Sequence, residues 1–561
     1  MIYTARISLK YYNSHISLFL SQNIDLHIFL LKYNYKSYNF KILQLFILIH
    51  KAYIFTTDLN ASMNYAQATY ILIGIYALFA LYLAYRGAKQ TASMKDFAIG
   101  KGFSPVVVGL SLAASITSAA TFIINPGFVA MFGWSAFFAM ALVLPAGLYI
   151  SLIVLSKSFR KYGSSIKALT LAQWVGTRFE SRTYTRIMAV LSLLLITFIV
   201  LICVGLTKVM AGALSADELY VLIGLVVFVF GYTMFGGANA MIYTNMVQAI
   251  MMIIVAVILL SSGYSYLQNG PDQFISSLQS IDPNLTGMFN AKSPLFRDAF
   301  EVIFCNFIIG IAIVCQPHII TRSLMLRSEK DINKYLTVAI ITEILFFFVM
   351  FAGLYARIEF PDLMQNGTAM KMDGILSAYV IHKFSVGVGL IVIVGLLAAG
   401  LSTLEGLVQS LSTTITNDLI LPLTGNESLE ENRKKQINRF VIAILAIISI
   451  IVSYDQLLHP NLSVGILAQN GVYAFFSAAF VPVLMGIFIK DAPKQAAIAA
   501  TITAVVVHFS VYYGSLTPYT TGPVKYPAVA GTLAILSALA VAAMVYYFSG
   551  KKIPSFQNQN P

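Results

Sequence analysis

Residues 102–156 read GFSPVVVGLSLAASITSAATFIINPGFVAMFGWSAFFAMALVLPAGLYISLIVLS and contain no Asp, Glu, Lys or Arg. The hydrocarbon core of a bilayer is about 30 Å thick and a helix of about 20 apolar residues crosses it, so this stretch alone holds two spans. It lacks the alternating polarity of a membrane β-strand, and backbone exposed to lipid must otherwise be helical. The stretch predicts an all-α polytopic membrane protein.

The rest of the chain has the same character. Of its 561 residues, 58% are hydrophobic and 11% charged, with a mean hydropathy of +0.79. A soluble domain needs roughly a quarter of its residues charged. Apolar stretches predict thirteen helices, at about 67–86, 104–130, 134–156, 187–213, 219–236, 243–267, 298–321, 335–356, 384–413, 440–456, 463–489, 495–513 and 528–548.

The net charge of +13 would suggest nucleic acid as a partner if the protein were soluble. In a membrane protein, Lys and Arg instead mark cytoplasmic loops. With the N-terminus outside, basic clusters such as Arg433-Lys434-Lys435 and the pair Arg322 and Arg327 fall in inside loops. The outside loops carry few basic residues, namely Lys292, Arg297, Arg357, Lys371, Lys383 and Lys525. We therefore expect a bacterial inner-membrane protein with its N-terminus outside, its C-terminus in the cytoplasm and no nucleic-acid partner.

Residues 1–62 differ from the rest, being crowded with Tyr, Ile, Asn, Lys and His. Met63 precedes a good span and is a plausible true start, so we interpret 1–62 as a non-native or disordered extension. We expect residues 63–551 to form one transmembrane domain and 552–561 a short cytoplasmic tail.

An extra span at the front suggests a five-plus-five core of inverted repeats, at about 104–267 and 298–489. Both lead helices contain disruptors, and small hydroxyl residues, Gly or Pro in mid-membrane allow a helix to open. They are Ser115, Thr117, Ser118 and Asn125-Pro126-Gly127 in the first lead helix, and Asn306, Gly310 and Gln316-Pro317 in the second. The alternative is a helix that is only kinked, because Gly and Pro are common in spans.

Three motifs then occur in order along the chain. They are Tyr232–Gly237 with Thr244–Gln248, then Gln316-Pro317-His318-Ile319 with Arg322, and Ala399-Gly400-Leu401-Ser402-Thr403 continuing to Asp418. Together they resemble the sodium:solute symporter family over most of residues 65–490. The second motif is most similar to the proline, pantothenate and monocarboxylate branches. The resemblance implies sodium-coupled import of a small organic solute by alternating access.

The resemblance also implies a set of sodium-binding residues: Ala114, Thr117, Ala399, Ser402 and Thr403. Sodium is a hard cation that needs several oxygen ligands, and hydroxyls and unwound carbonyls can supply them in apolar surroundings. The alternative for Ser402 and Thr403 is that they bond the backbone of their own helix. Sodium is the only ion expected, with no other metal and no cofactor.

Charged residues inside spans are functional suspects, because burying a charge in lipid is costly. Asn245 stands where sugar and proline carriers usually have an acidic residue, near the cytoplasmic end of its span. Glu405 lies two residues beyond Thr403. We hypothesise that Glu405, with Asn245, forms the sodium exit; the alternative is a protonated or Lys-paired Glu at a helix contact. Lys208 can snorkel or attract an anionic solute, and Glu343 has no clear role.

For the solute, the sequence favours a pocket between the two broken helices. Its expected lining is Ser118, Ala119, Thr121, Asn306 and Gln316. Small neutral residues near positive helix ends suit a carboxylate or a proline-like solute, with a sugar or another neutral solute as the alternative.

Other functional classes have less support. A symporter-like sensor or receptor should continue into a soluble effector domain. A channel is hard to exclude from motifs alone. An enzyme is not expected, because the sequence contains no P-loop, HExxH or G-x-S-x-G motif.

Overall fold

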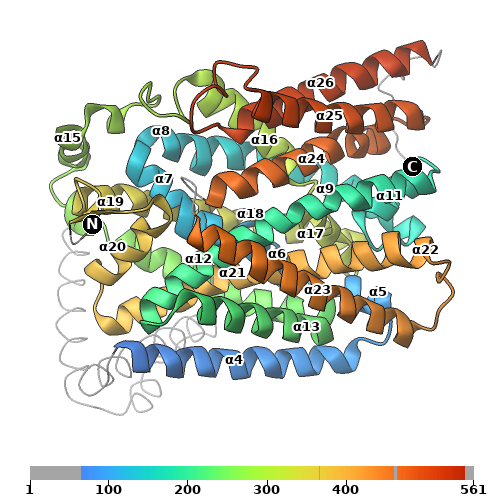
Figure 1. The fold of residues 1–561 in the computed structure, drawn as a ribbon, viewed down its shortest axis with the longest axis horizontal. Coiled ribbons are helices and arrows are strands. Elements are labelled where there is room, and N and C mark those ends of the chain that lie inside the picture. Colours follow the sequence, from blue (N-terminus) through green and yellow to red (C-terminus); the bar gives the residue numbers. More distant parts are fainter. Residues whose placement is uncertain (1–64, 101, 366, 460–463, 550–561) are drawn as a thin grey trace, which may run out of the picture. The chain divides into compact units, whose positions relative to one another are not determined.

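The computed structural model describes residues 65–100, 102–365, 367–459 and 464–549; the predicted extension 1–62 and the tail 552–561 lie outside this part. Helices dominate it (Figure 1). The longer helices are α4 (Tyr65–Gln90), α6 (Pro105–Ile116), α9 (Leu144–Ile166), α11 (Arg182–Leu191), α12 (Ile196–Leu214), α13 (Glu218–Ser261), α15 (Pro271–Ile281), α18 (Ile332–Phe348), α21 (Val386–Thr414), α23 (Glu431–Leu458), α24 (Val464–Phe488), α25 (Lys494–Gly514) and α26 (Pro527–Phe548).

Shorter elements connect these helices. The short α-helices are α5 (Met94–Ala98), α7 (Asn125–Phe132), α8 (Trp134–Phe137), α10 (Leu171–Arg178), α14 (Tyr264–Leu267), α16 (Asn306–Ile313), α17 (Pro317–Ile320), α19 (Ala352–Glu359), α20 (Ile375–Lys383) and α22 (Leu421–Leu423). The π-helical segments are η1 (Ala120–Ile124), η2 (Phe138–Val143), η5 (Phe300–Cys305) and η10 (Ile415–Ile420). The 3₁₀ segments are η3 (Ser192–Leu195), η4 (Pro283–Thr286), η6 (Thr321–Met325), η7 (Glu329–Asp331), η8 (Val349–Phe351) and η9 (Met372–Gly374). Strands β1 (Met364–Gln365) and β2 (Thr368–Ala369) form one antiparallel ribbon.

The number of spans agrees with the sequence. Among the described residues, ten helices are long and apolar enough to cross a bilayer, and two bent helix pairs raise the number to twelve. Helix α13 is 44 residues long, about 66 Å at 1.5 Å per residue, or twice a bilayer core. It therefore supplies two spans, which makes thirteen.

Helix α13 reverses direction at Gly237, whose φ of 55° is that of a left-handed residue. Tyr232 and Thr244 would lie about 18 Å apart on a straight helix, yet both donate hydrogen bonds to the Glu405 carboxylate. The chain must therefore fold back on itself between them. The predicted helices 219–236 and 243–267 leave a loop at 237–242. The structure has no such loop, because the second half of α13 begins directly after Gly237.

Both lead helices are broken, as the sequence predicts. The first bends by 55° between α6 and the η1–α7 segment, and the second by 59° between η5–α16 and α17–η6. The first break falls at residues 117–119, where Thr117 has ψ 94°. Asn125-Pro126-Gly127 does not break the helix, because Asn125 has helical dihedrals and follows the π-helical turn η1. A π-turn leaves room for the missing N–H of a proline.

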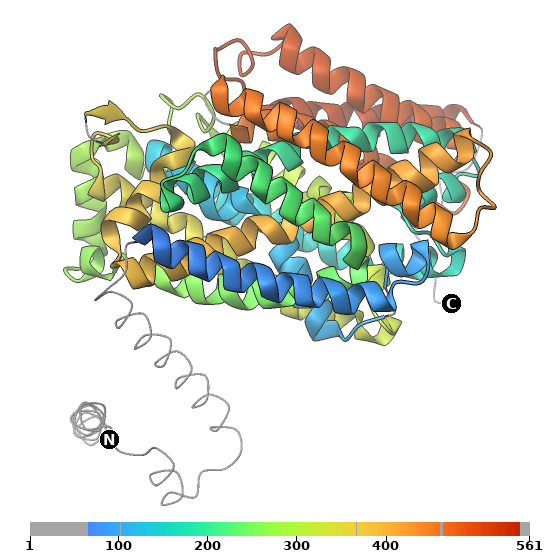
Figure 2. The ribbon, with the colours of Figure 1, turned by 60° about the horizontal axis from the view of Figure 1, so that its bottom comes forward.

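The packing supports two inverted repeats. The first helix of each half packs along the second helix of the other half: α6 on α18, and α16 on α9. Glycines allow both close approaches. A Cβ on Gly109 would lie 2.8 Å from the Tyr335 carbonyl, and one on Gly310 would lie 2.1 Å from the Leu144 carbonyl. The extra helix α4 runs along α13 at the margin of the bundle in both views (Figure 1, Figure 2).

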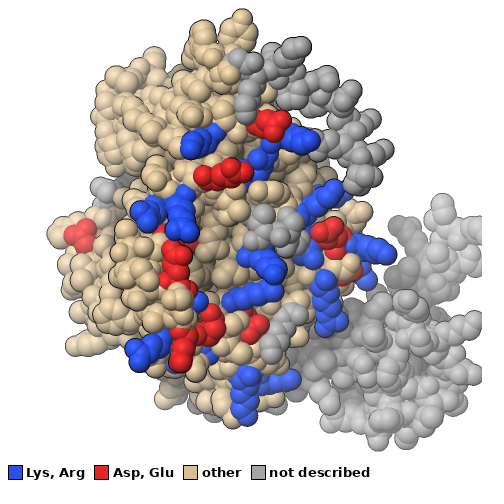
Figure 3. All heavy atoms as spheres, turned by 90° about the vertical axis from the view of Figure 1, so that its right-hand side faces the viewer, with Lys and Arg blue, Asp and Glu red and all other residues tan. Residues whose placement is uncertain are grey.

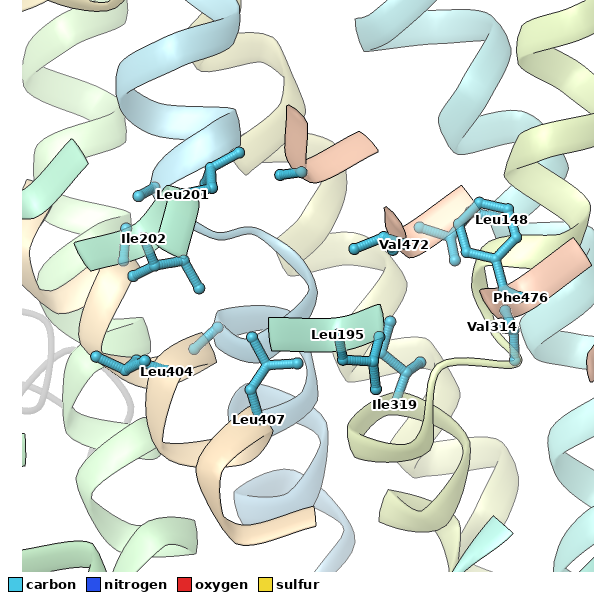
Figure 4. Packing of buried hydrophobic residues seen from close by; sticks show 14 of the residues in the cluster. Leu148, Leu195, Leu201, Ile202, Val314, Ile319, Leu404, Leu407, Val472 and Phe476 are labelled. Carbon is cyan, nitrogen blue, oxygen red and sulfur yellow. The ribbon is translucent and has the colours of Figure 1, made fainter. Parts of the chain in front are cut away.

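Most buried apolar residues form one large core, and Ala211, Leu214 and Val221 form a small second cluster. In the centre of the large core, Leu404 and Leu407 of α21 pack beside η3 and α12, and Ile319 of α17 lies nearby (Figure 4). Charged side chains gather instead on the end of the bundle at which α11 and α22 lie (Figure 1, Figure 3). The core therefore fixes the position of α21, whose hydroxyls face the first break.

Candidate ion and solute site

The first break faces two hydroxyls of α21. Ser402 Oγ donates to the carbonyl of Ala114 at 2.7 Å and to that of Ala399 at 3.0 Å. Thr403 Oγ1 donates to the carbonyl of Ser115 at 2.9 Å and approaches that of Ala114 at 3.5 Å. All five residues are fully buried. Four of the residues predicted to bind sodium thus converge, and Ser115 joins them.

The break explains why these carbonyls are available. Helix α6 ends at Ile116, so its last carbonyls have no helical N–H group four residues further on. The Thr117 N–H group still caps the Ala113 carbonyl at 3.1 Å, and its hydroxyl bonds the same carbonyl. Ala114 and Ser115 are left for α21. Thr117 itself lies at the break, with its side chain turned back onto α6.

Glu405 lies one turn further along α21 and is 1% exposed. Its carboxylate accepts hydrogen bonds from the hydroxyls of Tyr232 and Thr244, the latter at 2.6 Å, and from the Gln248 amide at 3.0 Å. The Gln248 amide also reaches Tyr76 on α4 at 2.7 Å. Glu405 is therefore held by hydroxyls and an amide, and the Lys-paired alternative does not describe this site.

Asn245 links this region to the ion cluster. Its Nδ2 donates to Ser115 Oγ at 3.0 Å and to the Ser402 carbonyl at 3.2 Å. The sequence placed Asn245 near the cytoplasmic end of its span. The structure places it beside Ser402, because the reversal at Gly237 folds the second half of α13 back along α21.

Arg322 is a residue whose position was predicted wrongly. The sequence assigned it to a basic loop, but it is 1% exposed inside the bundle. Its guanidinium donates to the hydroxyls of Ser111 and Ser115 on α6, and its Nε donates to the His318 carbonyl at 3.2 Å. The 3₁₀ turn η6 causes this burial, because the chain continues inside the bundle beyond the predicted end of the span. A buried cation and the buried Glu405 thus flank the Ser115–Asn245 contact.

Four of the five residues expected to line the solute pocket lie at the two breaks, and the fifth, Asn306, does not. Ser118, Ala119 and Thr121 are buried at the first break, and Gln316 is buried at the second. Asn306 belongs to another contact: its Nδ2 donates to the Glu301 carbonyl at 2.7 Å and its Oδ1 accepts from Tyr526 of α26 at 2.8 Å. The Asn306 amide is therefore occupied by helix packing.

The second break has polar atoms without partners. Among the described residues, Gln316 Oε1 and both ring nitrogens of His318 are buried without a hydrogen bond. His318 lies opposite Phe198 of α12, with the ring centres 6.4 Å apart. In the sequence, His318 is one member of the Gln316-Pro317-His318-Ile319 motif and was given no role of its own. A histidine directly after a predicted helix break was the signal that could have singled it out.

The two other charged residues inside spans have different surroundings. Lys208 Nζ lies 3.6 Å from a carboxylate oxygen of Asp373 in η9, so it forms an ion pair where snorkelling was expected. The turn η9 also covers the first broken helix, since a Cβ on Gly127 would lie 2.1 Å from the Met372 carbonyl. Glu343 is fully buried, and neither carboxylate oxygen has a hydrogen-bond partner in the described part of the chain.

Comparison with known proteins decides the family. The model of the sodium:solute symporter family matches residues 97–504. The chain belongs to this family. The sodium/pantothenate symporter of Escherichia coli K12 is 26% identical over 425 residues, covering 74% of this chain and 84% of that protein. Sodium/proline symporter 2 of Staphylococcus saprophyticus is also 26% identical, over 472 residues, covering 81% of this chain and 88% of that protein.

A solved structure of a Na⁺-coupled sialic acid symporter shares the fold. Its TM-score is 0.71 at 19% identity, and the match covers 87% of this chain and 99% of that one. The predicted helical architecture and the predicted family are therefore confirmed. The protein is a multi-pass membrane transporter that couples solute import to sodium.

Proposed function

We propose that this symporter imports a small carboxylate or proline-like solute together with a sodium ion that binds between α6 and α21. One observation carries the ion site: the hydroxyls of Ser402 and Thr403 converge on the carbonyls that the first break leaves free. A hard cation that inserts between these groups exchanges hydroxyl–carbonyl hydrogen bonds for direct oxygen ligands. The proposed ligands are the carbonyls of Ala114, Thr117 and Ala399 and the hydroxyls of Ser402 and Thr403.

We assign sodium release to Glu405 and Asn245. Asn245 donates to the Ser402 carbonyl, so its movement is coupled directly to the ion cluster. Glu405 supplies a buried carboxylate on α21, one turn beyond Ser402 towards the charged end of the bundle. A fixed negative charge there lowers the electrostatic cost of an ion that leaves on this side. The orientation goes with this proposal: the charged end faces the cytoplasm and the N-terminus lies outside, in a bacterial inner membrane.

The solute would lie between the two breaks, beside Ser118, Ala119, Thr121 and Gln316. The buried guanidinium of Arg322, which bonds Ser111 and Ser115 on α6, places a positive charge near the first break and favours an anionic group over a sugar. The relatives named above carry pantothenate and proline, which also favours a carboxylate-bearing solute. In alternating access, the bundle that contains the broken helices moves against α12, α13, α21 and α23, and exposes the site to one side at a time.

Counterflow in proteoliposomes tests this proposal. Vesicles that contain the full chain are preloaded with unlabelled proline, pantothenate, lactate or glucose, and uptake of the matching labelled compound is followed with sodium or with potassium outside. We expect sodium-dependent counterflow of at least one carboxylate and none of glucose. Sodium-dependent counterflow of glucose alone would refute the proposed solute class, and the absence of counterflow with sodium-dependent binding would identify a sensor.

A further inference from the structure

A second site lies far from the broken helices. A cavity of about 420 Å³ opens between α10, the start of α11, the η10–α22 end of the α21 span and the start of α23. Helices α11 and α22 both lie at the charged end of the bundle (Figure 1, Figure 3). The volume falls in the range of small-ligand sites.

One wall of this cavity is basic. Arg182 and Arg186 stand four residues apart on the first turns of α11. Lys434 and Glu427 of the same cavity lie near the start of α23, and Lys434 Nζ is paired with Glu431 at 3.1 Å. Like charges at this spacing repel, and cations are unfavourable at the positive end of a helix. Neither arginine forms an ion pair with any carboxylate among the described residues. The wall is therefore suited to an anionic group.

The opposite wall requires a hydrogen-bond donor. Asp418 is 1% exposed, and its Oδ2 accepts the Thr170 hydroxyl at 2.6 Å. Its Oδ1 has no partner at hydrogen-bonding geometry, although the Gln173 side chain lies beside the same carboxylate. A buried carboxylate oxygen without a partner is costly and favours a ligand with a hydroxyl or N–H group. The cavity thus combines a site for an anion with a site for a donor.

The surface beside the cavity is apolar and faces outward. Val190 and Leu193 follow Arg186 at four and seven residues on the same helical face, and they are 53% and 36% exposed. Leu423, next to the cavity residues Leu421 and Pro422, is 66% exposed. An apolar stripe that starts at a basic cavity is the arrangement that a lipid requires, with its headgroup in the cavity and its chains along the helix.

We propose that this cavity binds the phosphoglycerol headgroup of an anionic membrane lipid. The phosphate lies against Arg182 and Arg186, and a glycerol hydroxyl donates to Asp418 Oδ1. The cavity is also lined by α10, which lies in the connection between α9 and α11. Helix α10 is tied to η10 through Thr170 and to the end of α24 through Arg178, which donates to the Gly486 carbonyl at 2.6 Å. A headgroup in the cavity braces this connection.

Native mass spectrometry of the full chain tests the assignment. The protein is released from nanodiscs of phosphatidylethanolamine with either phosphatidylglycerol or phosphatidylcholine, and the lipids it retains are counted. We expect the wild type to retain one phosphatidylglycerol. The Arg182→Gln/Arg186→Gln variant should bind it about thirtyfold more weakly, because each basic residue near an anionic lipid is worth about 1 kcal/mol. Lys334→Gln, which removes an exposed basic residue from α18, should bind like the wild type.

A second variant tests the donor side. Asp418→Leu should lose the preference for phosphatidylglycerol over phosphatidic acid, which has a phosphate but no glycerol hydroxyl. Equal retention by the double arginine variant and the wild type would overturn the proposal, as would equal weakening by Lys334→Gln. Saturation of the site by soluble glycerol 3-phosphate with no lipid retained would overturn its assignment to the membrane.

Discussion

The two broken helices differ in what meets each break. At the first, the carbonyls of Ala114 and Ser115 accept hydroxyls from α21. At the second, Gln316 Oε1 and the His318 ring nitrogens meet no partner among the described residues. A break that the protein closes with its own oxygens suits an ion, since the ion only has to insert among them. A break with open donors and acceptors suits a solute that brings its own polar groups.

The largest effect of a single substitution is expected beside the first break. Glu405→Gln keeps a side chain that can bond Tyr232 and Thr244 but removes the charge. The sodium half-saturation concentration should rise tenfold or more, because a unit charge several ångströms from an ion contributes roughly 2 kcal/mol at an effective dielectric constant near 20. Sodium titration of uptake measures it, with the exposed Glu329→Gln as the control. An unchanged half-saturation would show that Glu405 has no electrostatic role.

A smaller effect is expected at the second break. Gln316→Leu and His318→Leu should each raise the KM for the solute about fivefold to tenfold, the cost of one hydrogen bond to a buried group. Sodium binding without solute should stay unchanged, because neither side chain has a hydrogen bond to the residues of the first break. Equal changes in solute and sodium affinity in these variants would remove the distinction between the two breaks.

The smallest effect is expected at the contact between α16 and α26. Tyr526→Phe removes the hydroxyl that donates to Asn306 Oδ1 at 2.8 Å. We expect a loss of about 1 kcal/mol in stability and a melting temperature lower by about one degree. Solute KM should be unchanged, because the Asn306 amide serves the contact with α26. A raised KM for the solute in Tyr526→Phe would show that Asn306 belongs to the solute site.

The sequence predicted the spans well and the interior polar contacts poorly. Span length and apolar composition determine the thirteen crossings, and small or hydroxyl residues with Gln316-Pro317 marked both broken helices. The sequence offered both Ser115, Thr117 and Ser118 and Asn125-Pro126-Gly127 as disruptors. It did not show that the helix continues through Asn125-Pro126-Gly127, because the π-helical turn before these residues is not visible in the composition. Arg322 was misplaced for a related reason. A buried arginine is tolerated only where it meets Ser111 and Ser115, and those contacts arise from tertiary packing.

Ser402 and Thr403 are proposed to bind the sodium ion at the first break, and this binding should not require the solute. Sodium binding to the purified, solute-free protein in nanodiscs, measured by calorimetry, tests this most directly. We expect saturable sodium binding by the wild type. In Ser402→Ala/Thr403→Ala the affinity for sodium should fall at least a hundredfold, and lipid retention should be unchanged. Sodium binding of wild-type strength in that double variant would contradict it.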